Sequence, residues 1–80
     1  MHYSNINFMV KSRKQADDLA GICAMYYDTA VVTSVGYIGG YFHEAPAVIR
    51  VGYENEHHDR LAWEKLVTTL IRKGYYDCIA

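Results

Sequence analysis

Residues 29–55 read TAVVTSVGYIGGYFHEAPAVIRVGYEN, and this stretch decides the fold. Two runs rich in β-branched and aromatic residues, 29–38 and 47–53, flank a segment that contains Gly39-Gly40 and ends at Pro46. Val, Ile, Thr and Tyr favour the pleated surface of a strand, whereas Gly and Pro favour turns. The stretch therefore predicts a β-hairpin with a long aromatic tip. Its first strand is apolar on both faces, which is typical of a central or a bulged strand.

A strand and a helix are expected before this hairpin. Residues 3–11 alternate, with Ile6, Phe8 and Val10 on one side, and such alternation indicates a half-buried strand. Ser12 followed by Gln15 matches a capping box and predicts the start of a helix. The apolar residues at helical spacing that follow are Ala16, Leu19, Ala20, Cys23, Tyr26 and Tyr27.

A second helix and a short strand are expected after the hairpin. Asn55 is a favourable N-cap, and Gly74 is a favourable residue just past a helix end. The residues expected to face the core are Ala62, Trp63, Leu66, Val67, Leu70 and Ile71. Residues 75–80, YYDCIA, are β-prone and suit a last strand.

The element order is therefore strand, helix, strand, strand, helix, strand. This is the ferredoxin-like βαββαβ arrangement, an α+β class of fold. Right-handed crossovers place both helices on one face of an antiparallel sheet in the strand order 4-1-3-2. With 80 residues, the chain is expected to form one domain, residues 1–80.

Composition argues against several classes of protein. A net charge of −1 gives no general attraction to nucleic acid, and no apolar run approaches the roughly 20 residues that span a bilayer. Residues 1–10 lack the pattern of a targeting segment, and two cysteines are too few for a disulfide scaffold. We therefore expect a cytoplasmic protein that does not bind membranes and keeps both thiols reduced.

The sequence contains no set of residues that points to an enzyme. Histidines and acids cluster at His43-Glu44 and at residues 54–59, but neighbouring helical positions such as His57 and His58 diverge by about 100°. A solvated helix start explains this cluster better than a metal site, because a metal needs converging ligands. Cys23 lies on an apolar stripe, and Gly36, Gly39 and Gly40 do not precede a helix as a phosphate loop would. We expect no catalytic residues, no metal and no cofactor.

The aromatic hairpin tip is the best candidate for a binding surface, because Tyr accounts for eight of the 80 residues and aromatic residues are enriched at interfaces. The sequence therefore predicts a small non-enzymatic protein-binding domain, an inhibitor or accessory factor that occludes a larger protein partner. Stand-alone domains of this size are familiar from phages and mobile elements, which is an analogy only. The residues expected to contact the partner are Tyr37, Ile38, Tyr41, Phe42, His43, Arg50 and Leu61. The alternative reading is that the tip folds back over the end of the sheet as a minor core.

Three other functions compete with this prediction. A homodimer would add interface area to a small core, and in one alternative a dimer encloses a small-molecule pocket. The residues expected to line that pocket are Tyr37, His43, Tyr53 and Trp63. Residues 50–53, RVGY, are a partial echo of an RNA-binding strand, and the net charge argues against that function. The histidine and acid cluster is the basis of the weaker metal-binding alternative.

Overall fold

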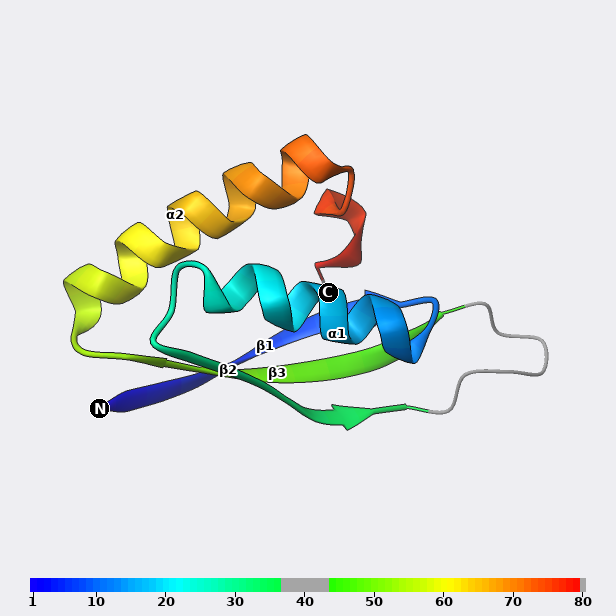
Figure 1. The fold of residues 1–80 in the computed structure, drawn as a ribbon, viewed down its shortest axis with the longest axis horizontal. Coiled ribbons are helices and arrows are strands. Elements are labelled where there is room, and N and C mark those ends of the chain that lie inside the picture. Colours follow the sequence, from blue (N-terminus) through cyan, green and yellow to red (C-terminus); the bar gives the residue numbers. More distant parts are fainter. Residues whose placement is uncertain (37–43, 80) are drawn as a thin grey trace.

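The computed structural model describes residues 1–36 and 44–79, which form a three-stranded antiparallel sheet with two helices on one of its faces (Figure 1). The elements in chain order are β1 (His2–Val10), α1 (Arg13–Ala24), β2 (Thr29–Val35), β3 (Ala45–Tyr53), α2 (Glu56–Lys73) and the short 3-10 helix η1 (Tyr76–Cys78). The strand order is β1-β3-β2, so β3 is central. The α+β class predicted from the sequence is confirmed.

The central strand β3 pairs with both of its neighbours. It pairs with β1 from His2 opposite Tyr53 to Val10 opposite Ala45. Its pairing with β2 shifts register between Val32 and Ser34, where Thr33 is the extra residue of a bulge. The bulge that the sequence allowed in this strand is present, but among the described residues β2 is an edge strand and not a central one.

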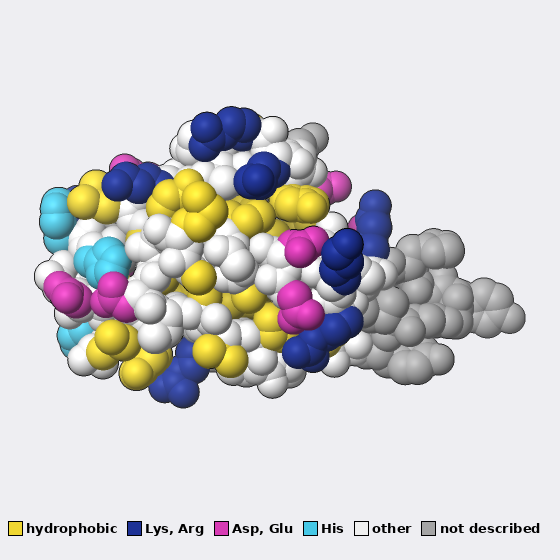
Figure 2. Space-filling model, viewed as in Figure 1, with side chains coloured by type: hydrophobic (Ala, Val, Ile, Leu, Met, Phe, Trp, Pro, Cys, Tyr) yellow, Lys and Arg dark blue, Asp and Glu magenta, His cyan; other side chains and the backbone are white. Residues whose placement is uncertain are grey.

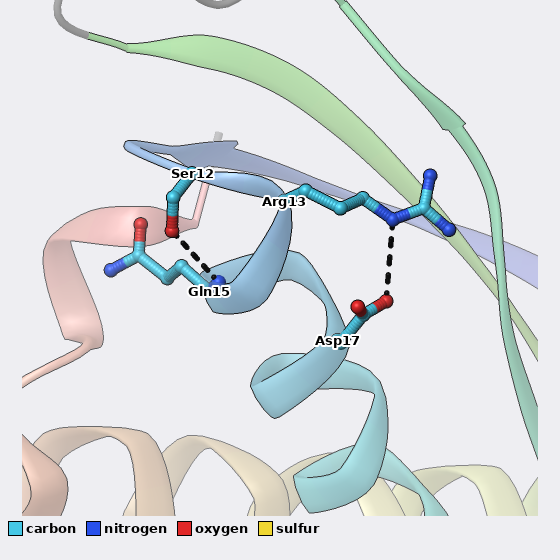
Figure 3. A network of polar contacts seen from close by, with 4 residues as sticks. All are labelled: Ser12, Arg13, Gln15 and Asp17. Carbon is cyan, nitrogen blue, oxygen red and sulfur yellow. Dashed lines mark hydrogen bonds and ion pairs between the residues drawn. The ribbon is translucent and has the colours of Figure 1, made fainter.

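Helix α1 begins at the predicted cap. The Ser12 hydroxyl accepts a hydrogen bond of 3.0 Å from the Gln15 amide (Figure 3). The Gln15 side chain does not complete the capping box, because its Oε1 accepts from the Lys11 amide at 2.6 Å. Arg13 Nε lies 3.4 Å from Asp17 Oδ1 on the exposed side, an ion pair that adds little stability in water.

Helix α2 has the predicted ends but a different buried face. Asn55 Oδ1 accepts from the His58 amide at 2.9 Å, and Gly74 closes the helix with a left-handed φ of 81°. The buried residues are Ala62, Leu66, Thr69 and Leu70. The prediction that Trp63 and Ile71 face the core is wrong, because their side chains are 38% and 59% exposed. Trp63 lies beside the buried stripe, and Ile71 lies on the opposite, exposed side of the helix.

The core fills the space between the sheet and the helices. Its largest fully buried side chains are Phe8, Leu19, Ile49, Leu66, Leu70, Val10, Val51 and Cys23. Ile22 of α1 is also buried, although the predicted apolar stripe does not include it. Tyr27 follows α1 and is 5% exposed, as that stripe predicted.

The C-terminal segment differs from the predicted fourth strand. Residues Tyr76–Cys78 form η1, and Ile79 then makes a single antiparallel bridge to Phe8 on the outer edge of β1. The backbone thus turns before it reaches β1, and among residues 75–79 only Ile79 makes the expected pairing. Within the described residues, no helix is long and apolar enough to cross a bilayer.

Candidate functional site

Most of the predicted partner-binding set belongs to the hairpin tip. Tyr37, Ile38, Tyr41, Phe42 and His43 lie outside the described residues. The two remaining residues of the predicted partner-binding set are Arg50 of β3 and Leu61 of α2, and both are exposed. Arg50 and Leu61 are thus the members of this set whose surroundings the structure describes.

Arg50 lies on the face of the sheet opposite the helices. Its neighbours Ile49 and Val51 are fully buried, so the alternation of the strand turns the Arg50 side chain away from the core. The Arg50 guanidinium carbon lies 4.0 Å from the centroid of the Tyr3 ring, which is a cation–π contact. Val31 pairs with Arg50 across the sheet and is 58% exposed. We call Tyr3, Val31 and Arg50 the open-face patch.

Gly52 leaves room for the Tyr3 ring on this face. Tyr3 and Gly52 are paired across β1 and β3. A Cβ at Gly52 would lie 2.5 Å from Thr29 Oγ1, closer than atoms pack, and 3.2 Å from Tyr3 Cε1, so the ring would have to shift by a few tenths of an ångström. The glycine therefore leaves the space that Thr29 and Tyr3 occupy, and the sequence signal for this was the Gly within an otherwise β-branched strand.

Leu61 does not join the open-face patch. It is 41% exposed on α2, and the sheet separates the helices from Arg50. The two described residues of the predicted binding set therefore belong to different surfaces.

A second candidate site lies along the outer edge of β1 and was missed from the sequence. It is a groove of about 480 Å³ between this edge and α2. The side chains that line it include Asn5 and Ile6 of β1, Val51 of β3, and Asp59, Arg60 and Trp63 of α2. We call it the β1-edge groove. Trp63 had been assigned to the core, which concealed its role as a wall of this groove.

Of the residues predicted to line a small-molecule pocket, Tyr37 and His43 lie outside the described residues, and Tyr53 and Trp63 lie within them. The Tyr53 hydroxyl shares a hydrogen bond of 2.8 Å with Ser4 Oγ. Trp63 instead faces the β1-edge groove, together with Ile6 and Val51. Tyr53 is not among the residues that line this groove, so the structure does not bring Tyr53 and Trp63 together around one cavity.

A third depression of about 560 Å³ lies between the helices. Asp17, Asp18 and Ile22 of α1 line one side, and Lys73 and Tyr75 line the other. Figure 2 shows this side of the molecule, where hydrophobic side chains lie between and along the helices with charged side chains of both signs around them. The mixed charge gives this depression no preference for an anion or a cation.

Within the histidine and acid cluster, His58 makes hydrogen bonds to the backbone. His58 Nδ1 accepts from the Glu54 amide at 3.1 Å, and His58 Nε2 lies 3.1 Å from the Tyr26 carbonyl oxygen, to which it donates as the neutral Nε2–H tautomer. Both ring nitrogens are therefore used by the backbone. Among the described residues, no group of three or more His, Cys, Asp or Glu side chains could hold a metal ion.

The two thiols and the Tyr27 phenol have raised pKa values. Burial raises the pKa of the Cys23 thiol to about 12, and burial followed by the Asp77 charge raises the pKa of Cys78. The pKa of Tyr27 is raised by burial and then by its hydrogen bond to Asp59, 3.0 Å from the phenol oxygen. Both cysteines are free and buried, and a thiol held neutral in this way is a poor nucleophile.

Comparisons with models of protein families, with curated proteins and with solved structures found no match to this chain.

Proposed function

We propose that this chain is a non-enzymatic protein-binding domain that contacts its partner through the open-face patch. The observation that carries the proposal is the Tyr3–Arg50 contact on the helix-free face of the sheet. Tyr3 is 49% exposed, although its ring is already held in place by Arg50 and by the space above Gly52. An aromatic ring that is fixed before binding loses little conformational entropy when a partner covers it.

The chemistry of the patch fits a protein surface. Tyr and Arg are the residue types that most often dominate binding energy, and Val31 adds an exposed apolar side chain beside them. Nucleic acid is the weaker candidate, because affinity for phosphates comes from an excess of positive charge and this chain carries a net charge of −1. An inhibitor or accessory factor would act by covering a working surface of a larger protein.

The fold proposal that accompanies this function is a ferredoxin-like domain. The pairing of β1, β3 and β2 and the two helices on one face fit the 4-1-3-2 order, and the bridge between Ile79 and Phe8 lies where the fourth strand would pair. In this proposal the fourth strand is reduced to one bridge.

The test is quantitative affinity capture from a native lysate with three forms of the protein. The patch variant carries Tyr3→Ser and Arg50→Ser, and the matched control carries Arg13→Ser and Ile71→Ser, which are exposed on α1 and α2. Loss of two such contacts is expected to weaken binding by roughly tenfold or more, so a specific partner should be retained by the wild type and the control and lost by the patch variant.

Two results would contradict this proposal. A partner retained equally by all three forms would place the binding surface elsewhere, with Leu61→Ser as the next variant to test. A captured protein that disappears after nuclease treatment would favour the RNA-binding alternative.

A further inference from the structure

We propose that the β1-edge groove binds an extended peptide segment of a partner protein, which adds to the sheet as a strand antiparallel to β1 and places an apolar side chain beneath Trp63. This proposal shares with the proposed function the class of partner, and it uses a different surface from the open-face patch. The two can therefore fail separately.

The direction of the backbone groups in β3 shows which groups of β1 are available. The carbonyl oxygens of Gly52 and Pro46 accept from the amides of Asp28 and Gly36, on the β2 side of the sheet. The N–H and C=O of one strand residue point to the same side, so the even-numbered residues of β3 face β2 and the odd-numbered residues face β1.

It follows that the even-numbered residues of β1 bond to β3, because Ser4 is opposite Val51 and Ile6 is opposite Ile49. The amide and carbonyl groups of Tyr3 and Asn5 point outward, along the free edge of the strand. In the described part of the chain, only the bridge between Phe8 and Ile79 occupies this edge. Free groups in this arrangement are complementary to another extended backbone.

The existing bridge limits the position of the added strand. Ile79 occupies the edge opposite Phe8 in an antiparallel bridge, so an added strand with the same direction lies against residues 2–7. Six residues of an edge strand span about 20 Å. This length accommodates the short segments that bind by strand addition.

The β1-edge groove supplies the side-chain specificity. Every second residue of an added strand would point to the helix side, between Ile6 and Val51 on the sheet and Trp63 on α2. Asp59 and Arg60 lie at the same groove, so polar residues of the segment have partners of both charges. The occupant is therefore a strand with a large apolar residue at the position that faces Trp63.

The two edges of the sheet are protected differently. Edge strands often carry bulges, Lys or Pro that prevent pairing with other chains. The edge strand β2 has its bulge at Thr33. Residues 2–7 of β1, HYSNIN, contain no Lys or Pro, and their register with β3 is unbroken. In the part of the chain that the structure describes, the β1 edge is thus the one left open for pairing.

A second copy of this chain fits the groove less well than a partner segment. In a two-fold pairing of β1 with β1, the helix-side residues offered to the groove are His2, Ser4 and Ile6. Two of these three are polar, whereas the space beneath Trp63 suits an apolar side chain.

The test begins with a displayed library of random dodecapeptides selected against the wild-type protein, and the selected peptides are then synthesised. Trp63 is the only tryptophan in the chain, so its fluorescence reports occupancy of the groove directly. Selected peptides are expected to alternate apolar and polar residues, to shift the Trp63 emission, and to slow hydrogen exchange at the Tyr3 and Asn5 amides.

Asn5 provides a matched pair of variants. Asn5→Pro removes the outward amide, which β3 does not use, and Asn5→Ala removes only the side chain. Asn5→Pro is expected to weaken peptide binding by about tenfold or more, and Asn5→Ala to leave it nearly unchanged. The Tyr3→Ser and Arg50→Ser variant should also keep peptide affinity, which separates this site from the open-face patch.

The proposal is overturned if the library yields no binding peptide, or if Asn5→Pro folds and binds the selected peptides as the wild type does. If Asn5→Pro does not fold, hydrogen exchange of the Tyr3 and Asn5 amides in the wild type replaces this test. Exchange rates that peptide leaves unchanged would then refute the site. Protection of these amides that rises with protein concentration alone would replace the peptide with a second copy of the chain.

Discussion

Cys23 shows how a single buried acid group links stability to pH. Its side chain is fully buried, and burial raises the pKa of the thiol from 9.0 to about 12. The folded state therefore holds this proton more tightly than the unfolded state. The resulting stability is present in full below pH 9.0 and is lost as the pH rises towards about 12.

We expect the free energy of unfolding to fall by a few kcal/mol across this alkaline range. Urea unfolding followed at a series of pH values measures the effect. Cys23→Ala should give a flatter dependence on pH, with the remaining slope due to groups such as Tyr27, whose pKa is also raised. If stability depended on pH equally in the wild type and in Cys23→Ala, Cys23 would ionise as easily in the folded state as in the unfolded state.

At the scale of elements, the sequence predicts the ends of the helices, which depend on neighbouring residues, but not the buried face of α2, which depends on packing against the sheet. Caps at Ser12 and Asn55 and the end at Gly74 depend on neighbouring residues, and the structure has all three. The buried face of α2 depends on where the sheet lies. Apolar residues occupy more than half of its circumference, so periodicity alone could not distinguish the stripe with Leu70 from the flank with Trp63.

The rotation of α2 gives a test with adjacent residues. Leu70→Ala removes a fully buried side chain and is expected to cost about 2–5 kcal/mol of unfolding free energy. Ile71 is 59% exposed, so Ile71→Ala is expected to cost under about 1 kcal/mol. Chemical denaturation of both variants measures the difference. Equal losses would mean that the sequence-based stripe, which included both residues, was correct.

The candidate sites were predictable from the sequence only in part. Arg50 alternates with the apolar residues Ile49 and Val51, and this pattern alone indicates that it lies on the exposed side of its strand. Its contact with Tyr3 joins residues 47 positions apart, and that contact needs the register between β1 and β3. The β1-edge groove depends on the missing fourth strand, because the β-prone residues 75–79 form η1 and a bridge instead.

At the scale of the whole molecule, side-chain hydrogen bonds join the segment after α1 to α2. Tyr26 pairs through its hydroxyl with Thr69, Tyr27 donates to Asp59, and His58 bonds the Tyr26 carbonyl. Thr69 is 2% exposed, and its hydroxyl bonds the Tyr26 hydroxyl and also accepts from Arg72 Nη2 at 3.4 Å. These contacts fix the segment after α1 against α2.

His58 is the clearest test of this connection. His58→Ala removes the acceptor for the Glu54 amide and the donor to the Tyr26 carbonyl, so we expect a loss of about 1–3 kcal/mol in unfolding free energy. His57→Ala, at the exposed neighbouring position, is the control and should change stability by less than about 0.5 kcal/mol. Thermal and urea unfolding of both variants measure it, and equal stabilities would show that the His58 contacts contribute nothing net.

The central position of β3 also determines when the protein can fold during its synthesis. Of the described strands, the two made first, β1 and β2, are not neighbours in the sheet, and each pairs with β3 alone. A nascent chain therefore cannot begin this sheet on the ribosome until residues 45–53 have left the exit tunnel. Until then two unpaired segments with apolar faces are available to chaperones. The pair of residues 2 and 53 is the most distant in sequence, and it can form only after residue 53 has been made.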